Sequence, residues 1–472
     1  MSNSVKKNTI FLSIGQFIQT ALAFILMPVA ARYLGDDGFG QYNLATAIMY
    51  IIFLVNDFGL NTLTTRENAR DRENAAIRFN DALLAKFAFI LLGAMALSVT
   101  FYIYDFTKPV ATMVAVFAIY GVFSSMGQLA TGVFRSYERM EYDAVITILE
   151  KLIITGLGVY VLTHGADLVA FASVFAVGGF VTFIAGVFLV HKKFFKIRLQ
   201  IDAARTSALV KQAMIFGFSM FLVTIYDRVA VLMLGKMQTD AVVGWYSAAY
   251  KLIALTSVIP TIIVTATFPK LSRESNVRDE VVALLFTKGF KYLVFLVLPL
   301  IAGVAILAEP LIRLICGPGY EPAVPALRVL VFTSGLSFMN IYLAGLFWAT
   351  NHQKTMFIFQ ALALVANVAL NLFLIPRYAH LGAAWASVAT EGLVFLLAFY
   401  MTVTKITRIA ESAFFWKSLV ATAVMMAFLL TTPSLHIFVS VLVAMLVYFI
   451  SLYLLRGFAL AEILSFRQQT EG

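Results

Sequence analysis

Fourteen apolar runs, each long enough to cross a bilayer, constrain this chain more than any other feature of its sequence. A helix needs about 20 mostly apolar residues to cross a hydrocarbon core of about 30 Å. Unpaired backbone groups are costly in lipid, so helices are expected rather than strands. The sequence therefore predicts an all-α, polytopic membrane protein with about 14 transmembrane helices, at approximate positions 9–31, 42–64, 81–103, 109–134, 145–163, 168–190, 209–235, 242–268, 288–308, 326–349, 356–375, 381–403, 414–432 and 435–455.

The composition agrees with lipid as the main solvent. The chain is 61% hydrophobic and 13% charged, whereas soluble proteins carry about 25% charged residues. Its net charge of +10 comes from short basic clusters between the apolar runs, which argues against nucleic-acid binding. Residues 9–31 are too long for the apolar core of a signal peptide and are expected to be retained. The single cysteine, Cys316, excludes an internal disulfide, and no Cys/His cluster has metal-binding spacing.

Lysine and arginine favour the cytoplasmic side of a membrane. With the N-terminus inside, the inner connections hold 25 of these residues and the outer connections hold six, Arg32, Lys108, Lys236, Arg313, Arg328 and Arg377. We therefore expect both termini in the cytoplasm, in a multi-pass protein of the cell inner membrane. The longest inner connection, 191–208, mixes cations with Phe194, Phe195 and Ile197, which predicts a helix or strand lying on the anionic inner leaflet.

An internal repeat divides the chain. "YLGDDGFGQYNLAT" at 33–46 and "MLGKMQTDAVVGWYSAAY" at 233–250 both contain Gly-x-Tyr-x-x-Ala, and each joins the first two helices of a six-helix unit. Parallel repeats of this kind pack as two lobes. The predicted domains are an N-terminal lobe with its basic linker (1–208), a second lobe (209–410), and two additional helices with a tail (411–472). The alternative is chance recurrence in a Gly- and Ala-rich chain.

Two cations are predicted to lie deep in adjacent helices. Arg228 precedes the outer end of its helix by seven residues and Lys251 follows the start of the next by nine, which corresponds to depths of about 10 and 14 Å. Charges at such depth usually face an interior or a watery cavity. An arginine fork and a lysine point charge suit a phosphate or diphosphate. The alternative is an ion pair, Asp227 with Lys251, that fixes the two helices.

Acidic and amide side chains inside the spans are the other candidates. Asp57 and Glu391 are suited to relaying a proton or holding a cation, or, for Asp57, to capping or bonding a neighbouring helix. Asn340 is suited to binding sugar hydroxyls, although side chains of this kind more often join helices. Lys86 is expected to reach water near the inner face. Arg32, at an outer helix end, is an interfacial anchor or part of a cavity mouth.

Signatures of catalysis are missing from the sequence. It has no G-x-S-x-G, no HExxH and no P-loop. The sequence therefore predicts a protein that is not an enzyme and uses no cofactor. Without an ATP site, work must come from ion gradients or from substrate flow.

Five segments together resemble a known family: "ARYLGDDGFGQYNLA", "DFGLNTLTTRENAR", "YDRVAVLMLGKMQTDAVVGWYSAAYKL", "FPKLSR" and "NLFLIPRYAHLGAAWASVATEG". In their order, and with fourteen spans, they are similar to the Wzx-type polysaccharide flippases of the multidrug/oligosaccharidyl-lipid/polysaccharide exporter superfamily. The resemblance implies two six-helix lobes in a V around a cationic cavity. It also implies alternating access, which moves a polyprenyl-diphosphate-linked oligosaccharide to the outer leaflet for surface polysaccharide biosynthesis.

The resemblance also implies roles for individual residues. Arg32, Arg228 and Lys251 become candidate diphosphate contacts, with Asn340 added for the sugar. Asp57, Asp227 and Glu391 become candidates for H+ or Na+ coupling or for charge balance. Expected partners are membrane lipids, a polysaccharide polymerase and glycosyltransferases. The alternatives are a cation-coupled drug antiporter or a lipid II flippase of the same superfamily, a non-transporting scaffold, and an oligosaccharide polymerase or ligase.

Overall fold

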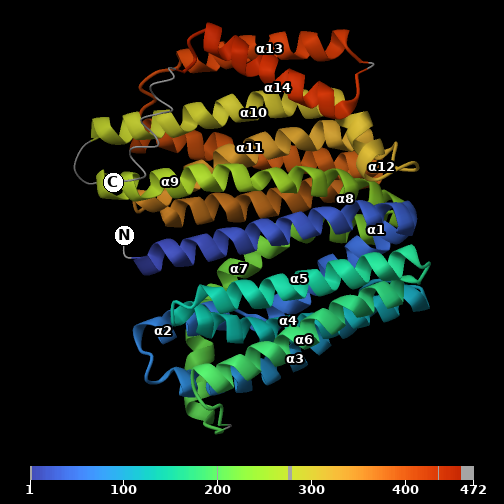
Figure 1. Cartoon of the computed structure of the whole chain (residues 1–472), viewed down its shortest axis with the longest axis vertical. Coiled ribbons are helices and arrows are strands. Elements are labelled where there is room, and N and C mark those ends of the chain that lie inside the picture. Colours follow the sequence, from blue (N-terminus) through green and yellow to red (C-terminus); the bar gives the residue numbers. More distant parts are fainter. Residues whose placement is uncertain (1–2, 199, 275–278, 434, 459–472) are drawn as a thin grey trace. The chain divides into compact units, whose positions relative to one another are not determined.

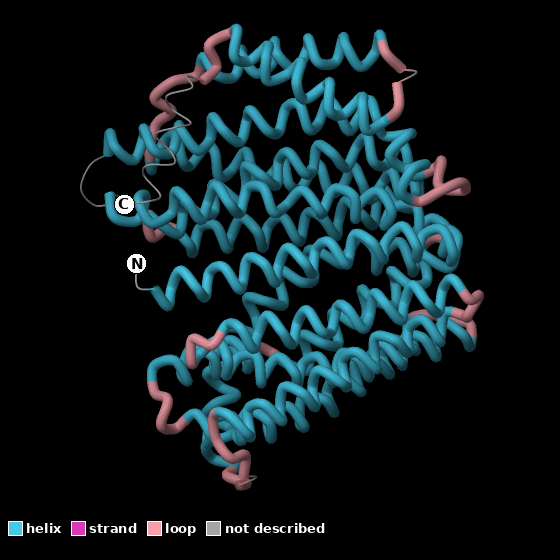
Figure 2. The backbone as a smooth tube through the Cα atoms, viewed as in Figure 1, coloured by secondary structure: helices cyan, strands magenta, loops and turns pink. Residues whose placement is uncertain are grey.

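The computed structural model describes residues 3–198, 200–274, 279–433 and 435–458. Within these residues the regular structure is entirely helical (Figure 2). The helices are α1 (Asn3–Asp57), α2 (Leu60–Arg70), α3 (Ala75–Ile103), α4 (Lys108–Ser136), α5 (Met140–Thr163), α6 (Leu168–Lys193), α7 (Ala203–Met237), α8 (Asp240–Ala254), α9 (Val258–Glu274), α10 (Asp279–Ile315), α11 (Ala323–Ala349), α12 (Gln353–Met401), α13 (Ala413–Thr431) and α14 (Ile437–Leu454), with short 3-10 and π segments at Leu255–Ser257 and Thr402–Ile406.

Breaks in the longest helices reconcile these elements with fourteen crossings. In the described part of the chain, 11 helices are long and apolar enough to cross a membrane, or 12 with the bent pair in α7. Two of them, Ile14–Asp57 and Gln353–Ile406, have 44 and 54 residues, about twice what one crossing needs. Each contains a residue with positive φ, Gly35 at 69° and Ala379 at 48°. Each long helix therefore corresponds to two expected spans, and the predicted all-α fold with many membrane-spanning helices is confirmed.

The chain forms two compact units, Met1–Gly244 (unit 1) and Trp245–Gly472 (unit 2). In unit 1, α4 packs along α6 and α1 packs along α5, while α7 contacts α1, α2 and α3 (Figure 1). In unit 2, α11 packs against α9, α10 and α12, and α13 and α14 pack on each other and on α10. The domain boundaries at residues 208 and 410 remain predictions.

The repeated sequence forms a close helix crossing inside unit 1. A Cβ added to Gly40 would overlap the backbone oxygen of Asp240, and a Cβ added to Gly244 would overlap that of Asp36. Asp36 and Gly40 occupy the same repeat positions as Asp240 and Gly244. The two copies therefore touch symmetrically through their backbones, and the Gln41 side chain adds a hydrogen bond to Asp240 Oδ2 at 2.8 Å.

The connection between α6 and α7 differs from its expected form. Residues 194–198 and 200–202 are irregular, neither helix nor strand. Phe194, Phe195 and Ile197 pack against the buried core of unit 1. The centroids of the Phe194 and Phe134 rings are 5.4 Å apart. The prediction of a helix or strand was wrong for these residues, because the apolar side chains pack on the protein's own core. The predicted position of the segment on the anionic leaflet stays a prediction.

Candidate functional site

A buried ion pair joins three helices of unit 1. Lys86 Nζ on α3 donates to Asp57 Oδ1 at the end of α1 and to Ser125 Oγ on α4, both at 2.7 Å. Its side chain is 0% exposed. A break in the chain positions Asp57: Phe58 and Gly59 have φ of 37° and 85°, which ends α1 before α2 begins. Asp57 Oδ1 also accepts a hydrogen bond from the Asn61 backbone N–H at 3.3 Å.

This geometry corrects the expectation for Lys86. We expected its ammonium to reach water, but α3 begins at Ala75, so Lys86 lies about 16 Å along the helix. A buried charge is tolerated when a counter-charge and hydrogen bonds accompany it. Next to the pair, Asn56 is buried and neither atom of its amide has a hydrogen-bond partner. The geometry agrees with the alternative in which Asp57 bonds a neighbouring helix, here α3 through Lys86.

Arg228 lies on an aromatic ring in the same unit. Its guanidinium carbon is 4.2 Å from the centroid of the Tyr50 ring, which joins α7 to α1. Arg228 is half-buried, and its sequence neighbour Asp227 is exposed. The two charges point in different directions because successive residues of a helix are turned by about 100°. Arg32 is exposed and lies on α1, three residues before the kink at Gly35.

In unit 2, the candidate residues Asn340 and Glu391 are in contact. Asn340 Nδ2 on α11 donates to Glu391 Oε2 at 2.6 Å and to the Glu391 backbone oxygen at 3.0 Å. Asn340 is buried and Glu391 is half-buried. Nearby on α12, Asn367 Nδ2 donates to Thr390 Oγ1 at 3.0 Å and Asn371 donates to Asn367 at 2.7 Å. Lys251, also half-buried, lies on α8.

Unit 2 also contains an apolar cavity of about 520 Å³. Residues of α10, α11, α12, the connection before α13 and the start of α13 line it: Phe290, Val294, Val297, Leu298, Ile301, Phe332, Gly335, Leu336, Met339, Val388, Phe395, Phe399, Ile409, Ser412, Phe414, Phe415 and Trp416. Several of these, including Phe332 and Trp416, are themselves exposed. None of the described residues that line the cavity is charged, so its chemistry suits a hydrocarbon chain rather than a headgroup.

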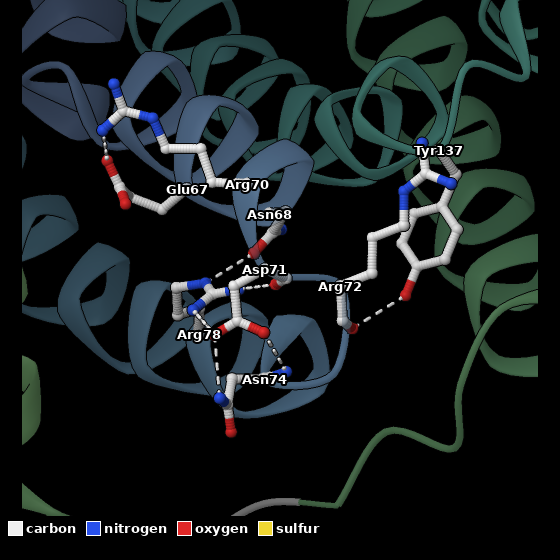
Figure 3. Close-up of polar contacts among 8 residues, drawn as sticks. All are labelled: Glu67, Asn68, Arg70, Asp71, Arg72, Asn74, Arg78 and Tyr137. Carbon is white, nitrogen blue, oxygen red and sulfur yellow. Dashed lines mark hydrogen bonds and ion pairs between the residues drawn. The ribbon is translucent and has the colours of Figure 1, made fainter.

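A polar network surrounds the α2–α3 connection of unit 1 (Figure 3). Asp71 Oδ2 accepts hydrogen bonds from Asn74 Nδ2 at 2.8 Å and from Arg78 Nη1 at 3.0 Å. The hydrogen bond from Asn74, and then that from Arg78, lower the pKa of Asp71 from 3.8 to about 2. The Tyr137 hydroxyl donates to the Arg72 backbone oxygen at 3.2 Å. The network ties the α2–α3 connection to the α4–α5 connection.

The predicted site residues therefore fall in both units. Arg32, Asp57, Asp227 and Arg228 belong to unit 1, and Lys251, Asn340 and Glu391 belong to unit 2. Sequence reasoning missed Tyr50, Lys86 and Ser125 as partners of the candidates. Lys86 was recognisable as a lysine within a long apolar run, whereas nothing in the sequence distinguished Tyr50 from other tyrosines.

Comparison with known proteins gives concordant results. Residues 5–275 match the model of a family described as polysaccharide biosynthesis protein. The chain is 24% identical over 422 residues to a putative O-antigen transporter of Escherichia coli (strain K12), covering 83% of this chain and 95% of that protein. It is 21% identical over 457 residues to the probable low-salt glycan biosynthesis flippase Agl15 of Haloferax volcanii, covering 94% of each chain.

Solved structures support the fold. The lipid II flippase MurJ in an inward closed conformation matches with a TM-score of 0.80 and 16% identity, covering 95% of this chain and 99% of that one. An inward-facing multidrug resistance MATE family transporter of the MOP superfamily matches with a TM-score of 0.62 and 17% identity, covering 83% and 97%. At these identities the likeness concerns the fold alone.

Proposed function

Because the chain belongs to the polysaccharide biosynthesis protein family, we propose that it is a flippase for polyprenyl-diphosphate-linked oligosaccharide. It moves this substrate from the cytoplasmic to the outer leaflet for surface polysaccharide biosynthesis. The observation that carries the proposal is the similarity to a glycan biosynthesis flippase along nearly the whole length of both chains. The activity is transport by alternating access of two lobes, 1–208 and 209–410, and involves no catalysis.

Cationic side chains bind the diphosphate. Arg228 offers a planar fork with several N–H donors, which matches phosphate oxygens, and Lys251 adds a point charge. The Tyr50 ring under the Arg228 guanidinium favours the charged side chain at that position. Arg32 contributes at the cavity mouth. Asn340 Oδ1, which accepts no hydrogen bond from the described residues of the protein, accepts from a sugar hydroxyl. The headgroup thereby exchanges its hydration for protein contacts while it crosses the membrane.

The polyprenyl chain needs no polar contacts and remains in an apolar environment. The cavity in unit 2 has this character, with aromatic and aliphatic walls from α10 to α13. Helix α13, in the segment 411–472, contributes one wall of it through Phe414, Phe415 and Trp416. This additional helix therefore contributes to holding the lipid part of the substrate.

Acidic residues balance charge or couple ions. The Asp57 carboxylate already has Lys86 as its counter-charge, so its role is charge balance within unit 1. Asp227, which is exposed, and Glu391, which is half-buried, are the better candidates for H+ or Na+ coupling. The protein lies in the inner membrane with both termini in the cytoplasm, beside the glycosyltransferases that supply its substrate and the polymerase that consumes it.

A flipping assay in proteoliposomes tests the function. Fluorescent polyprenyl-diphosphate oligosaccharide is reconstituted with the protein, and the fraction accessible to an external quencher is followed. Arg228→Ala should slow flipping about tenfold or more, because a charge-assisted contact contributes about 1.5–3 kcal/mol. Arg228→Lys, which keeps the charge without the fork, should lose less.

Parallel assays separate the alternatives. Lipid II in place of the oligosaccharide carrier tests for a lipid II flippase, and dye efflux from cells tests for a drug antiporter. Polymer formed by the purified protein from lipid-linked sugars would indicate a polymerase. If the protein flips no polyprenyl-diphosphate oligosaccharide while one of these assays is positive, the proposal is wrong.

A further inference from the structure

A basic segment, residues 191–198, separates its cationic and apolar side chains. Its sequence is "HKKFFKIR". Phe194, Phe195 and Ile197 pack onto the core of unit 1, whereas Lys192, Lys193, Lys196 and Arg198 are exposed. The segment therefore presents four positive charges on a surface that its own apolar residues anchor to the protein.

The other arginines at this end of unit 1 have carboxylate partners. Within 4.0 Å, Arg66 and Arg70 pair with Glu67, Arg72 with Glu138, Arg78 with Asp71, Arg135 with Asp143, Arg139 with Glu141, and Arg205 with both Asp81 and Asp202. In the part of the chain that the structure describes, none of the four cations of the basic segment has such a partner. Arg205 pairs with the carboxylates of both Asp81 and Asp202, the latter in the same connection as the segment.

Hydrogen bonds hold the basic segment in place. The Gln200 backbone N–H donates to Asn80 Oδ1 at 3.3 Å, and Asn80 Nδ2 donates to the Gln200 backbone oxygen. The Ile197 N–H bonds to His191 Nδ1 at 3.3 Å. The Asp202 side chain accepts from the Arg205 N–H at 3.0 Å and so caps α7. The four charges are thus displayed on a fixed backbone, which reduces the entropy lost when they bind a ligand.

The position of the segment identifies the ligand. Helix α6 is long and apolar enough to cross a membrane and ends at Lys193, so we expect the cations to begin where hydrocarbon gives way to headgroups. We propose that Lys192, Lys193, Lys196 and Arg198 bind the phosphate groups of anionic phospholipids. Each lysine or arginine near an anionic leaflet contributes about a fivefold preference, from about 1 kcal/mol per residue. This site is separate from the substrate contacts proposed above.

Lipid binding to the purified full-length protein tests the proposal. The protein is reconstituted in nanodiscs of phosphatidylcholine containing phosphatidylglycerol, and the enrichment of phosphatidylglycerol around it is measured by mass spectrometry. Lys192→Gln, Lys193→Gln, Lys196→Gln and Arg198→Gln combined should reduce the enrichment about tenfold or more. Replacing the three lysines with arginine should preserve it. The changed side chains are exposed and have no carboxylate partner among the described residues, so the fold should be retained, as thermal unfolding checks.

Two results would overturn the inference. One is equal enrichment of phosphatidylglycerol around the glutamine variant and the natural protein. The other is loss of enrichment in the arginine variant as strong as that in the glutamine variant, which would point to lysine-specific contacts rather than charge. Lipid enrichment is measured without any flipping. A negative enrichment result therefore does not contradict the proposed transport function, and a negative flipping result does not contradict lipid binding by the basic segment.

Discussion

The ammonium of Lys86 illustrates how a single residue can organise a membrane protein. Its two hydrogen bonds reach Asp57 and Ser125 on different helices, and its side chain has no access to solvent. Charges buried in this way stabilise a fold only as a pair, since each alone carries a large desolvation cost. The pair therefore determines how α1, α3 and α4 meet.

Removing one partner should be worse than removing both. Lys86→Met leaves the Asp57 carboxylate buried and unpaired, which should cost about 3–5 kcal/mol and lower the midpoint of thermal unfolding in detergent. Lys86→Met combined with Asp57→Leu should recover part of that loss. If the double variant is less stable than Lys86→Met alone, the two side chains do not act as a pair.

The Asp71 network predicts an acid-dependent stability. Hydrogen bonds from Asn74 and Arg78 lower the pKa of Asp71 from 3.8 to about 2. Because the folded-state pKa is the lower one, the contribution of Asp71 is complete above 3.8 and is lost as the pH falls toward 2. The gap in unfolding midpoint between the natural protein and Asp71→Asn should therefore narrow in that pH range. A gap that is constant with pH would contradict this assignment.

Glycines act at the scale of whole helices, where the two copies of the repeat cross. Gly40 and Gly244 each face the backbone oxygen of an aspartate from the opposite copy. A methyl group has no room in either place, so the helices approach more closely than other residues would allow. Small residues at helix crossings have this function in membranes generally.

Gly40→Ala should force these helices apart. Overpacking of this kind costs about 1–3 kcal/mol, so the unfolding midpoint should fall, and Gly244→Ala should behave in the same way. Gly156→Ala is the matched control, because no heavy atom lies within 4 Å of the added Cβ and alanine favours a helix by about 1 kcal/mol. Equal midpoints for the Gly40 and Gly156 variants would show that the crossing tolerates a side chain.

At the scale of the whole molecule, the distribution of lysine and arginine predicts the orientation in the membrane. Cys316 is buried, and Cys316→Ser provides a background for introduced cysteines. A cysteine at Lys196 should react with a membrane-impermeant maleimide only after the cells are opened. A cysteine at Asp105, exposed between α3 and α4, should react in intact cells. The reverse pattern would invert the proposed topology.

The sequence alone predicted the fold class, the crossings and the family, and it located the two copies of the repeat. It also singled out Asn340, Glu391 and Asp57 as unusual. It could not pair them correctly, because a pattern of apolar runs does not say which helix faces which. Lys86 was assigned to water for the same reason, since its true partner lies on a helix that the local sequence does not identify.

Hydrophobicity is a property of each residue and its immediate neighbours, so the bilayer-spanning segments follow directly from the order of residues. Partners of buried polar groups depend on how the helices pack. Lys86 and Asp57 are 29 positions apart, and Asn340 and Glu391 are 51. Tertiary structure alone decided these pairs and the contact of Arg228 with the Tyr50 ring. It also decided that the basic segment exposes its cations. Each of these features depends on which helix surfaces are buried against one another.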